Sequence, residues 1–229
     1  MDSFGAYKMA IGTYLAGWVR SIQPTNYGDG TEALVAINNR GDVCVSQSLS
    51  PYAEGVRLGD TWQTGHATAS AFTNVAAMPT TRAELVLFNG EPALGGKSYV
   101  IESVSFLSLT SIAAAAAVTI VAQVVGSGTA PADDTAQLIT SQSGRPTYGG
   151  RARRAIANTA FAVANKWQVL AADSSAGPAA SIGFSVRSQV DGQLIVPPGG
   201  ILCLNTVVGT AVGTSLIQVV WSERQIVVG

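Results

Sequence analysis

From about Arg82 onward the chain repeats short apolar segments, several of them closed by Gly, Pro or Asn. The clearest of them covers residues 98–109, where Tyr99, Ile101 and Val104 are interleaved with Glu102, Ser103 and Ser105. Such alternation is typical of a strand with one buried face. The segments follow one another along the chain at 84–88, 98–109, 113–125, 161–163, 167–170, 182–186, 193–196, 201–207 and 215–221. Roughly eight strands over about 150 residues, with turn residues between them, predict an all-β antiparallel β-sandwich.

Three stretches of this series leave alternatives open. The five alanines at 113–117 favour a helix by propensity, but the Val, Ile and Thr residues around them favour a strand, which we expect. Residues 150–158 are predicted to form a short helix or a loop between sheets. The segments 161–163 and 167–170 flank Asn165-Lys166 like the two arms of a hairpin.

The first 81 residues follow a different pattern. Residues 32–37 and 42–47 are predicted to pair as a hairpin around Asn39-Arg40-Gly41, and residues 50–81 show only weak periodicity. We therefore expect an N-terminal arm or small β region at 1–81, ordered by contact with a neighbour, and a β-sandwich at 82–229. The N-terminus is interpreted as mature protein, and the longest apolar stretch, 112–125, is too short to span a membrane.

Chemically reactive side chains are scarce. Charged residues make up 12% of the chain, against roughly 25% in an ordinary domain, and His66 is the one histidine. Catalytic and metal sites need several His, Cys, Asp, Glu or Lys side chains within reach of each other, so we expect no enzyme, cofactor or metal. A net charge of −1 argues against a nucleic-acid binder. Cys44 and Cys203 lie in apolar runs and are predicted to be buried free thiols, made in a reducing cytosol.

Three motifs have a functional and a structural interpretation. Residues 90–98 end in Gly-Lys-Ser like a phosphate-binding loop, but Gly90 is one residue too early, and the following segment is strand-like, so a loop between strands is favoured. His66 is expected to be a polar loop or interface residue. Asp133-Asp134 is expected to be a solvated turn and not a calcium site.

One basic cluster stands out, at Arg145, Arg151, Arg153 and Arg154, with Tyr148 among them. Arginine is favoured at interfaces because its planar guanidinium binds carboxylates and stacks on aromatic rings. We expect a protein interface there, with a solvated loop as the second interpretation and phosphate contact as the third. Four aromatic residues of the N-terminal segment are further candidate anchors: Tyr7, Tyr14, Trp18 and Tyr27.

The C-terminal part carries a family resemblance. Residues 193–202 have the form strand, Pro-Pro-Gly-Gly, strand, followed by Gly209-Thr210 and the closing segment 215–223. Together with 87–90 and 95–101, this pattern resembles the jelly-roll structural proteins of tailed bacteriophage virions, in particular head decoration (cement) or minor capsid proteins. The resemblance covers residues 82–229.

The resemblance implies a homotrimer of jelly rolls on the capsid exterior, where it would bind and stabilise the major capsid protein shell. It implies no specific nucleic acid and no membrane partner. Two alternatives stay open. One is a receptor- or glycan-binding adhesin of a phage tail or head fibre, with Trp62 and Trp167 as candidate contacts. The other is an enzyme that would pair carboxylates such as Glu102 and Asp191.

Overall fold

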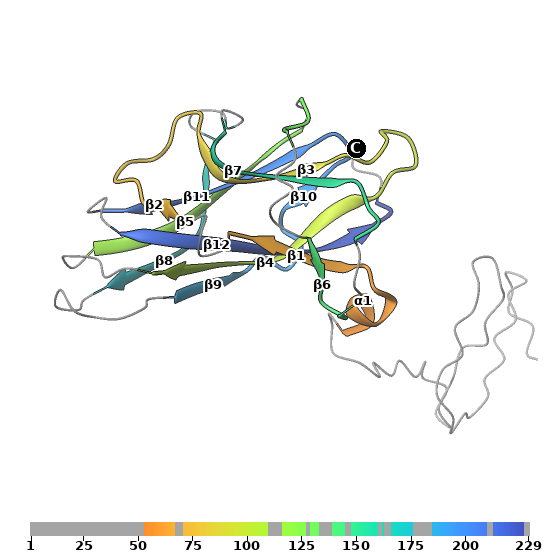
Figure 1. Cartoon of the computed structure of the whole chain (residues 1–229), viewed down its shortest axis with the longest axis horizontal. Coiled ribbons are helices and arrows are strands. Elements are labelled where there is room, and N and C mark those ends of the chain that lie inside the picture. The colour runs from red at the N-terminus through yellow and green to blue at the C-terminus, as the bar shows by residue number, and fades with distance from the viewer. Residues whose placement is uncertain are drawn as a thin grey trace, which may run out of the picture. The chain divides into compact units, whose positions relative to one another are not determined.

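The computed structural model describes residues 53–66, 71–109, 116–126, 129–132, 139–144, 148–159, 162, 166–175, 185–209 and 213–226 (Figure 1). The chain divides into two compact units, residues 1–51 and 52–229. The account below concerns the second unit. The predicted hairpin at 32–47 and the aromatic candidates Tyr7, Tyr14, Trp18 and Tyr27 lie outside the described residues, as do Cys44 and Asp133-Asp134.

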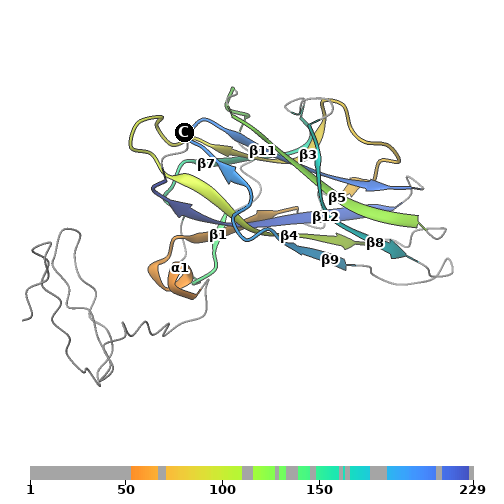
Figure 2. The ribbon, with the colours of Figure 1, turned by 180° about the vertical axis from the view of Figure 1, so that it is seen from behind.

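The described chain forms two antiparallel sheets that pack face to face, seen from both sides in Figures 1 and 2. A helix, α1 (Ala53–Leu58), precedes them. The larger sheet contains β1 (Thr61–Gly65), β2 (Phe72–Thr73), β4 (Ser98–Ser108), β6 (Thr140–Ser141), β9 (Ser185–Gln189), β10 (Ile195–Val196) and β12 (Thr214–Arg224). The smaller sheet contains β3 (Ala83–Asn89), β5 (Ala116–Val125), β7 (Ala152–Thr159), β8 (Gln168–Ser175) and β11 (Ile201–Val208).

Eight of these strands are connected as in a jelly roll. In chain order they are β1, β3, β4, β5, β8, β9, β11 and β12. In the larger sheet the first pairs with the eighth, the eighth with the third, and the third with the sixth. In the smaller sheet the second pairs with the seventh, the seventh with the fourth, and the fourth with the fifth. This is the alternating order of a double Greek key, so the fold is a jelly-roll-like β-sandwich, as expected.

The core lies between the two sheets and comes mainly from alternate residues of the long strands. Its largest fully buried side chains include Trp221, Tyr99, Phe106, Leu85 and Ile120. A second apolar cluster lies around Val86, Phe88, Ile201 and Cys203, together with Ala162 and the partly buried Trp167. Strand β3 is therefore buried along its whole length, whereas β4 alternates between buried and more exposed positions.

Three sequence-based expectations differ from the structure. Residues 61–65 and 72–73 belong to the larger sheet through pairing with β12, so the sandwich begins before the expected boundary at 81/82. Their sequence shows little periodicity, and it is the pairing with β12 that makes them part of the sheet. Residues 152–159 form strand β7 along the edge of β3, in place of a helix or loop. Residues 168–170 belong to β8 and pair with the distant β5, while residues 161 and 163–165 of the predicted hairpin lie outside the described residues.

Two other expectations are confirmed. Residues 116–125 form a strand, consistent with their β-branched residues, and residues 113–115 of the alanine run lie outside the described residues. Residues 90–97 form a turn between β3 and β4 with no helix after it, so the arrangement that a phosphate-binding loop needs is missing there. The Asn89 side chain shapes this turn. Its Nδ2 donates to the carbonyl oxygens of Lys97 (2.9 Å) and Val196 (3.0 Å), and its Oδ1 accepts from the Glu91 N–H.

Candidate functional site

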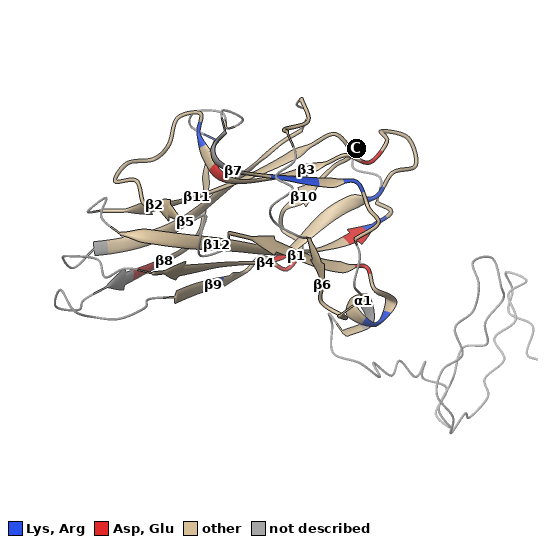
Figure 3. Ribbon diagram, in the orientation of Figure 1, with Lys and Arg blue, Asp and Glu red and all other residues tan. Residues whose placement is uncertain are grey.

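Arg153 and Arg154 of the predicted cluster lie on β7, the edge strand of the smaller sheet, and Arg151 directly precedes it. Among the described strands β7 pairs with β3, and it ends the order β7-β3-β11-β5-β8. Arg151 and Arg153 are exposed, and Figure 3 shows the basic segment along this strand. Arg145 lies outside the described residues. Two of the four predicted arginines are therefore placed at an accessible sheet edge.

Arg154 has a different position from its neighbour. Its side chain is buried, with 1% relative exposure, and its Nη1 donates to the Gly65 carbonyl oxygen at 2.8 Å. Gly65 is the last residue of β1, so this bond joins the edges of the two sheets. The predicted role of Arg154 as a surface contact is therefore corrected: strand alternation turns it inward while Arg153 faces out.

Tyr148 connects several strands within the chain. Its hydroxyl donates to Glu223 Oε1 at 2.6 Å and accepts from the Ala152 N–H at 2.9 Å. Its ring packs edge-on against Trp62, with 4.7 Å between centroids. The hydroxyl is also 3.4 Å from that of Tyr99. Tyr148 was predicted to be an interface anchor, but these contacts give it an internal role that fixes the start of β7.

A mixed-charge cluster surrounds the Tyr148 hydroxyl. Lys97 Nζ is 3.7 Å from Asp60 Oδ1 and 3.9 Å from Glu223 Oε2, so it forms ion pairs with both carboxylates. Burial raises the pKa of Glu223, although the Tyr148 hydrogen bond and Lys97 both oppose the shift. Burial also raises the pKa of Tyr148 and of Tyr99. The positive charge of Lys97 and the Tyr148 hydroxyl both stabilise the Glu223 carboxylate. Such mutually paired groups are typical of a structural contact within the chain.

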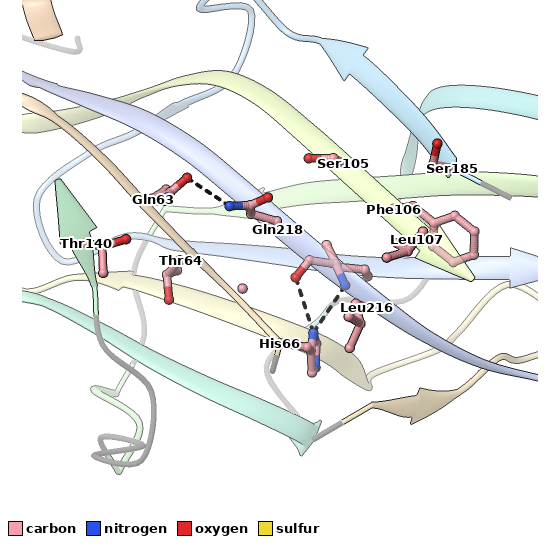
Figure 4. Close-up of a pocket in the computed structure, with 12 residues that line it drawn as sticks. Gln63, Thr64, His66, Ser105, Phe106, Leu107, Thr140, Ser185, Leu216 and Gln218 are labelled. Carbon is pink, nitrogen blue, oxygen red and sulfur yellow. Dashed lines mark hydrogen bonds between the residues drawn. The ribbon is translucent and has the colours of Figure 1, made fainter. Parts of the chain in front are cut away.

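A groove of about 400 Å³ lies on the larger sheet (Figure 4). Strand register explains it. One row across the sheet runs Gly65, Gln218, Ser105, Arg187, and a neighbouring row pairs Leu216 with Leu107. A Cβ at Gly65 would lie 2.7 Å from the Ile217 carbonyl oxygen and 2.9 Å from Gln218 Cα, so only glycine fits there. The small residues Gly65 and Ser105 lie on either side of Gln218 and leave a depression in the face of the sheet.

The groove is lined without charged side chains. Its polar members are two amides, several hydroxyls and the His66 imidazole, and its apolar members include Leu107 and Leu216 (Figure 4). Gln63 Oε1 accepts hydrogen bonds from the amides of Gln218 (2.9 Å) and Gln142. Arg187 is next in the central row, but its Nη2 donates to Ser103 Oγ in the adjacent row. The groove therefore presents hydrogen-bond donors, hydrogen-bond acceptors and aliphatic groups, with no Asp, Glu, Lys or Arg side chain in its lining.

His66 directly follows β1 at the rim of this groove. Its Nδ1 lies 3.4 Å from both the N and the O of Ile217 (Figure 4), and its ring is 5.0 Å from that of Phe72. The backbone N–H of His66 also donates to the Ile217 carbonyl oxygen at 2.9 Å. These contacts make His66 a half-buried residue that continues the sheet pairing. Within the described residues, no group of three His, Cys, Asp or Glu side chains could hold a metal ion.

The remaining sequence candidates are placed as follows. Cys203 is a buried free thiol, and burial raises its pKa to about 12. Trp62 is 8% exposed, and Trp167 donates from Nε1 to the Pro79 carbonyl oxygen at 2.8 Å while packing on the second cluster. Neither tryptophan offers the open ring expected of a glycan contact.

A backbone hydrogen bond links the two residues of the predicted carboxylate pair. The Asp191 N–H donates to the Glu102 carbonyl oxygen at 3.1 Å. The Glu102 carboxylate itself accepts from Ser222 Oγ at 2.6 Å. Its side chain is thus turned to β12.

The sequence analysis missed the groove. Gln63, Gly65 and Ser105 form no motif, and Ser105 lies about forty residues further along the chain than the other two. Only the register of β1, β12 and β4 brings them into adjacent rows, and one residue of slip would turn them to the other face. The one usable signal was the alternation at 98–109, which indicated that β4 has an open face.

Comparisons with known proteins give little further guidance. No family model and no curated protein matches this chain. Among solved structures it is similar to a chain of the cryo-electron microscopy structure of Mud Crab Dicistrovirus, with 8% identity and a TM-score of 0.23. The match covers 93% of this chain and 90% of that chain. The fold assignment accordingly depends on this chain's own strand pairing. Within the described residues no helix has the length and apolar character to cross a membrane.

Proposed function

We propose that this chain is a virion structural protein, a decoration or cement protein on the exterior of a capsid like those of tailed bacteriophages. It would act as a homotrimer that binds the major capsid protein and adds interface area between neighbouring shell subunits. Specific interfaces bury about 1,600 Å² in total, and permanent ones bury more. A subunit of this kind needs broad complementary surfaces, and it does not need a catalytic cleft.

The observation that carries the proposal is a pair of exposed arginines, Arg153 on the edge strand β7 and Arg151 directly before it, in a sandwich that otherwise has few charges. In the larger sheet only four strand residues are charged: Glu102, Arg187, Glu223 and Arg224. Burying a charged side chain costs free energy because the charge loses its hydration. A surface with few charges can therefore be buried against another subunit at a low cost in free energy. Arg151 and Arg153 would then supply orientation by pairing with carboxylates of the shell.

The edge position of β7 adds a second supporting feature. Edge strands present backbone N–H and C=O groups that can pair with another chain, and charged side chains there limit indiscriminate pairing. Arg151 and Arg153 would admit an acidic partner and repel a basic one, which includes a second β7 edge. The partner surface at this edge is therefore expected to be acidic.

The test is co-sedimentation of the purified chain with shells assembled from the major capsid protein of the virus that carries its gene. We expect saturable binding by the unaltered chain and a loss of about tenfold or more in the double variant Arg151→Glu, Arg153→Glu. Lys166→Glu, which reverses another exposed cation, is the matched control and should bind normally. A chain that stays monomeric and does not bind shells contradicts the proposal.

A further inference from the structure

We propose that the groove between β1, β12 and β4 is a binding site for a neutral saccharide. This activity goes beyond the subunit role proposed above, and it depends on a different surface from the β7 edge. The argument starts from the shape of the groove, continues through the chemistry of its lining, and then compares the kinds of molecule that could occupy it.

The volume of the groove suits a small ligand. Its roughly 400 Å³ lies within the range of about 300–1,000 Å³ that small-molecule sites usually have. The hollow is built into the backbone, because Gly65 has no room for a side chain against Ile217 and Gln218. The backbone therefore fixes part of the hollow, and the side chains of Gln63, Gln218 and Leu107 form the rest of its wall.

The amides leave unused hydrogen-bonding capacity. Gln63 Oε1 receives two donors, from Gln218 and Gln142. This arrangement orients the Gln63 amide and leaves its two N–H groups, as well as the Gln218 side-chain oxygen, without a partner among the described residues. A free donor pair and a free acceptor on neighbouring strands match the vicinal hydroxyls of a sugar, each of which donates and accepts.

Further hydroxyl and aliphatic groups complete the lining. Ser105, Thr140 and Ser185 contribute hydroxyls, and Leu107, which is 41% exposed, lies beside Leu216. A pyranose ring presents hydroxyls at its edge and C–H groups on its faces, so it can match amides on one side and leucines on the other. Because no Asp, Glu, Lys or Arg lines the groove, a charged ligand would lose hydration without gaining an ion pair.

An extended peptide is less well matched to this place. Peptides usually add to a sheet through an open edge, where unpaired backbone groups are available. At the β1 edge the Gly65 carbonyl oxygen already accepts from Arg154, and Gln63 is paired with Thr140 of β6. The groove offers side-chain amides on the face of the sheet, and these favour a ligand with many hydroxyls.

The experiment uses the full-length chain on an array of neutral oligosaccharides ending in glucose, galactose, mannose or N-acetylhexosamine. Sialylated and sulfated glycans on the same array act as charge controls, and a set of peptides tests the alternative occupant. The strongest neutral saccharide is then titrated by calorimetry. We expect binding to a neutral saccharide, and preference for charged glycans or for peptides would overturn the proposal.

Variants locate the site. Gln218→Leu and Ser105→Leu should each weaken saccharide binding about tenfold, through a lost hydrogen bond or a filled groove. Gln189→Leu is the matched control, because Gln189 is exposed on the same sheet outside the groove, and its affinity should stay within about twofold. Urea unfolding of each variant shows that the fold is retained. Absence of saccharide binding, or equal binding by all variants, would contradict the assignment.

Discussion

The outer faces of the two sheets differ sharply, although the strands alternate in the same way. On the larger sheet the outward residues Gln63, Ser105 and Gln218 are partly or fully exposed. On the smaller sheet the outward residues Val86 and Cys203 are completely buried under a second apolar cluster. The centre of the outer face of the smaller sheet is thus covered, although its edge strands β7 and β8 carry exposed residues such as Arg153 and Val169, and the larger sheet keeps an open outer face.

The largest expected difference comes from placing the same carboxylate on each outer face. Cys203→Asp should lower the free energy of unfolding by about 3–5 kcal/mol, because the carboxylate would lie unpaired between Val86 and Gln123. Gln218→Asp, next to Gly65 and Ser105, should change it by no more than about 0.5 kcal/mol. Urea unfolding curves measure both values. Similar losses in the two variants would mean that the two faces are equally covered.

A second substitution removes part of the cover from the smaller sheet. Trp167→Ala should lower the free energy of unfolding by about 2 kcal/mol, since the partly buried ring and its hydrogen bond to Pro79 are both lost. Val169→Ala on β8 is the matched control, with a side chain that is 57% exposed, and should have little effect.

The same Trp167→Ala variant should also expose Cys203 to thiol reagents. Burial holds the pKa of this thiol near 12, so the folded protein should react slowly at pH 8. Labelling rates in a Cys44→Ser background measure the change. An unchanged rate would show that Trp167 does not cover the thiol.

The smallest effect concerns Glu84, a carboxylate on the covered face of β3. Burial raises its pKa, and Arg82, with Nε 3.2 Å from Glu84 Oε1, only partly opposes the shift. A raised folded-state pKa means that the native state keeps the proton longer than the unfolded chain does. Stability should therefore fall as pH rises from the usual value near 4.5 through the raised folded-state pKa.

Glu84→Gln tests this pH dependence, because it removes the ionisation while keeping the shape. The decline in unfolding free energy between about pH 4 and pH 7 should become shallower by an amount on the order of 1 kcal/mol. A smaller decline of the unfolding free energy with pH should remain, since the pKa of Glu223 is also raised in the folded state. Parallel pH profiles for the two proteins would show that Glu84 is not desolvated by its cover.

The contrast between the faces was partly visible in the sequence. Alternation at 98–109 predicted one buried and one open face for β4, and the apolar run around Cys203 predicted a buried thiol, which the structure confirms. The sequence did not reveal that 61–65 would complete the larger sheet, because Thr-Trp-Gln-Thr-Gly becomes a strand through pairing with β12. The sequence analysis assigned Arg153 and Arg154 the same interface role. The pairing of β7 with β3 shows that Arg153 is exposed and Arg154 is buried.

The central claim, a structural subunit of a virus particle, is tested most directly by quantitative mass spectrometry of particles purified from a culture expressing the gene. The account predicts that the chain is present in a fixed ratio to the major capsid protein. It also predicts that membrane-impermeant reagents label exposed residues such as Lys166 on intact particles. Highly purified particles that lack the chain, while the infected cells contain it, would contradict the account.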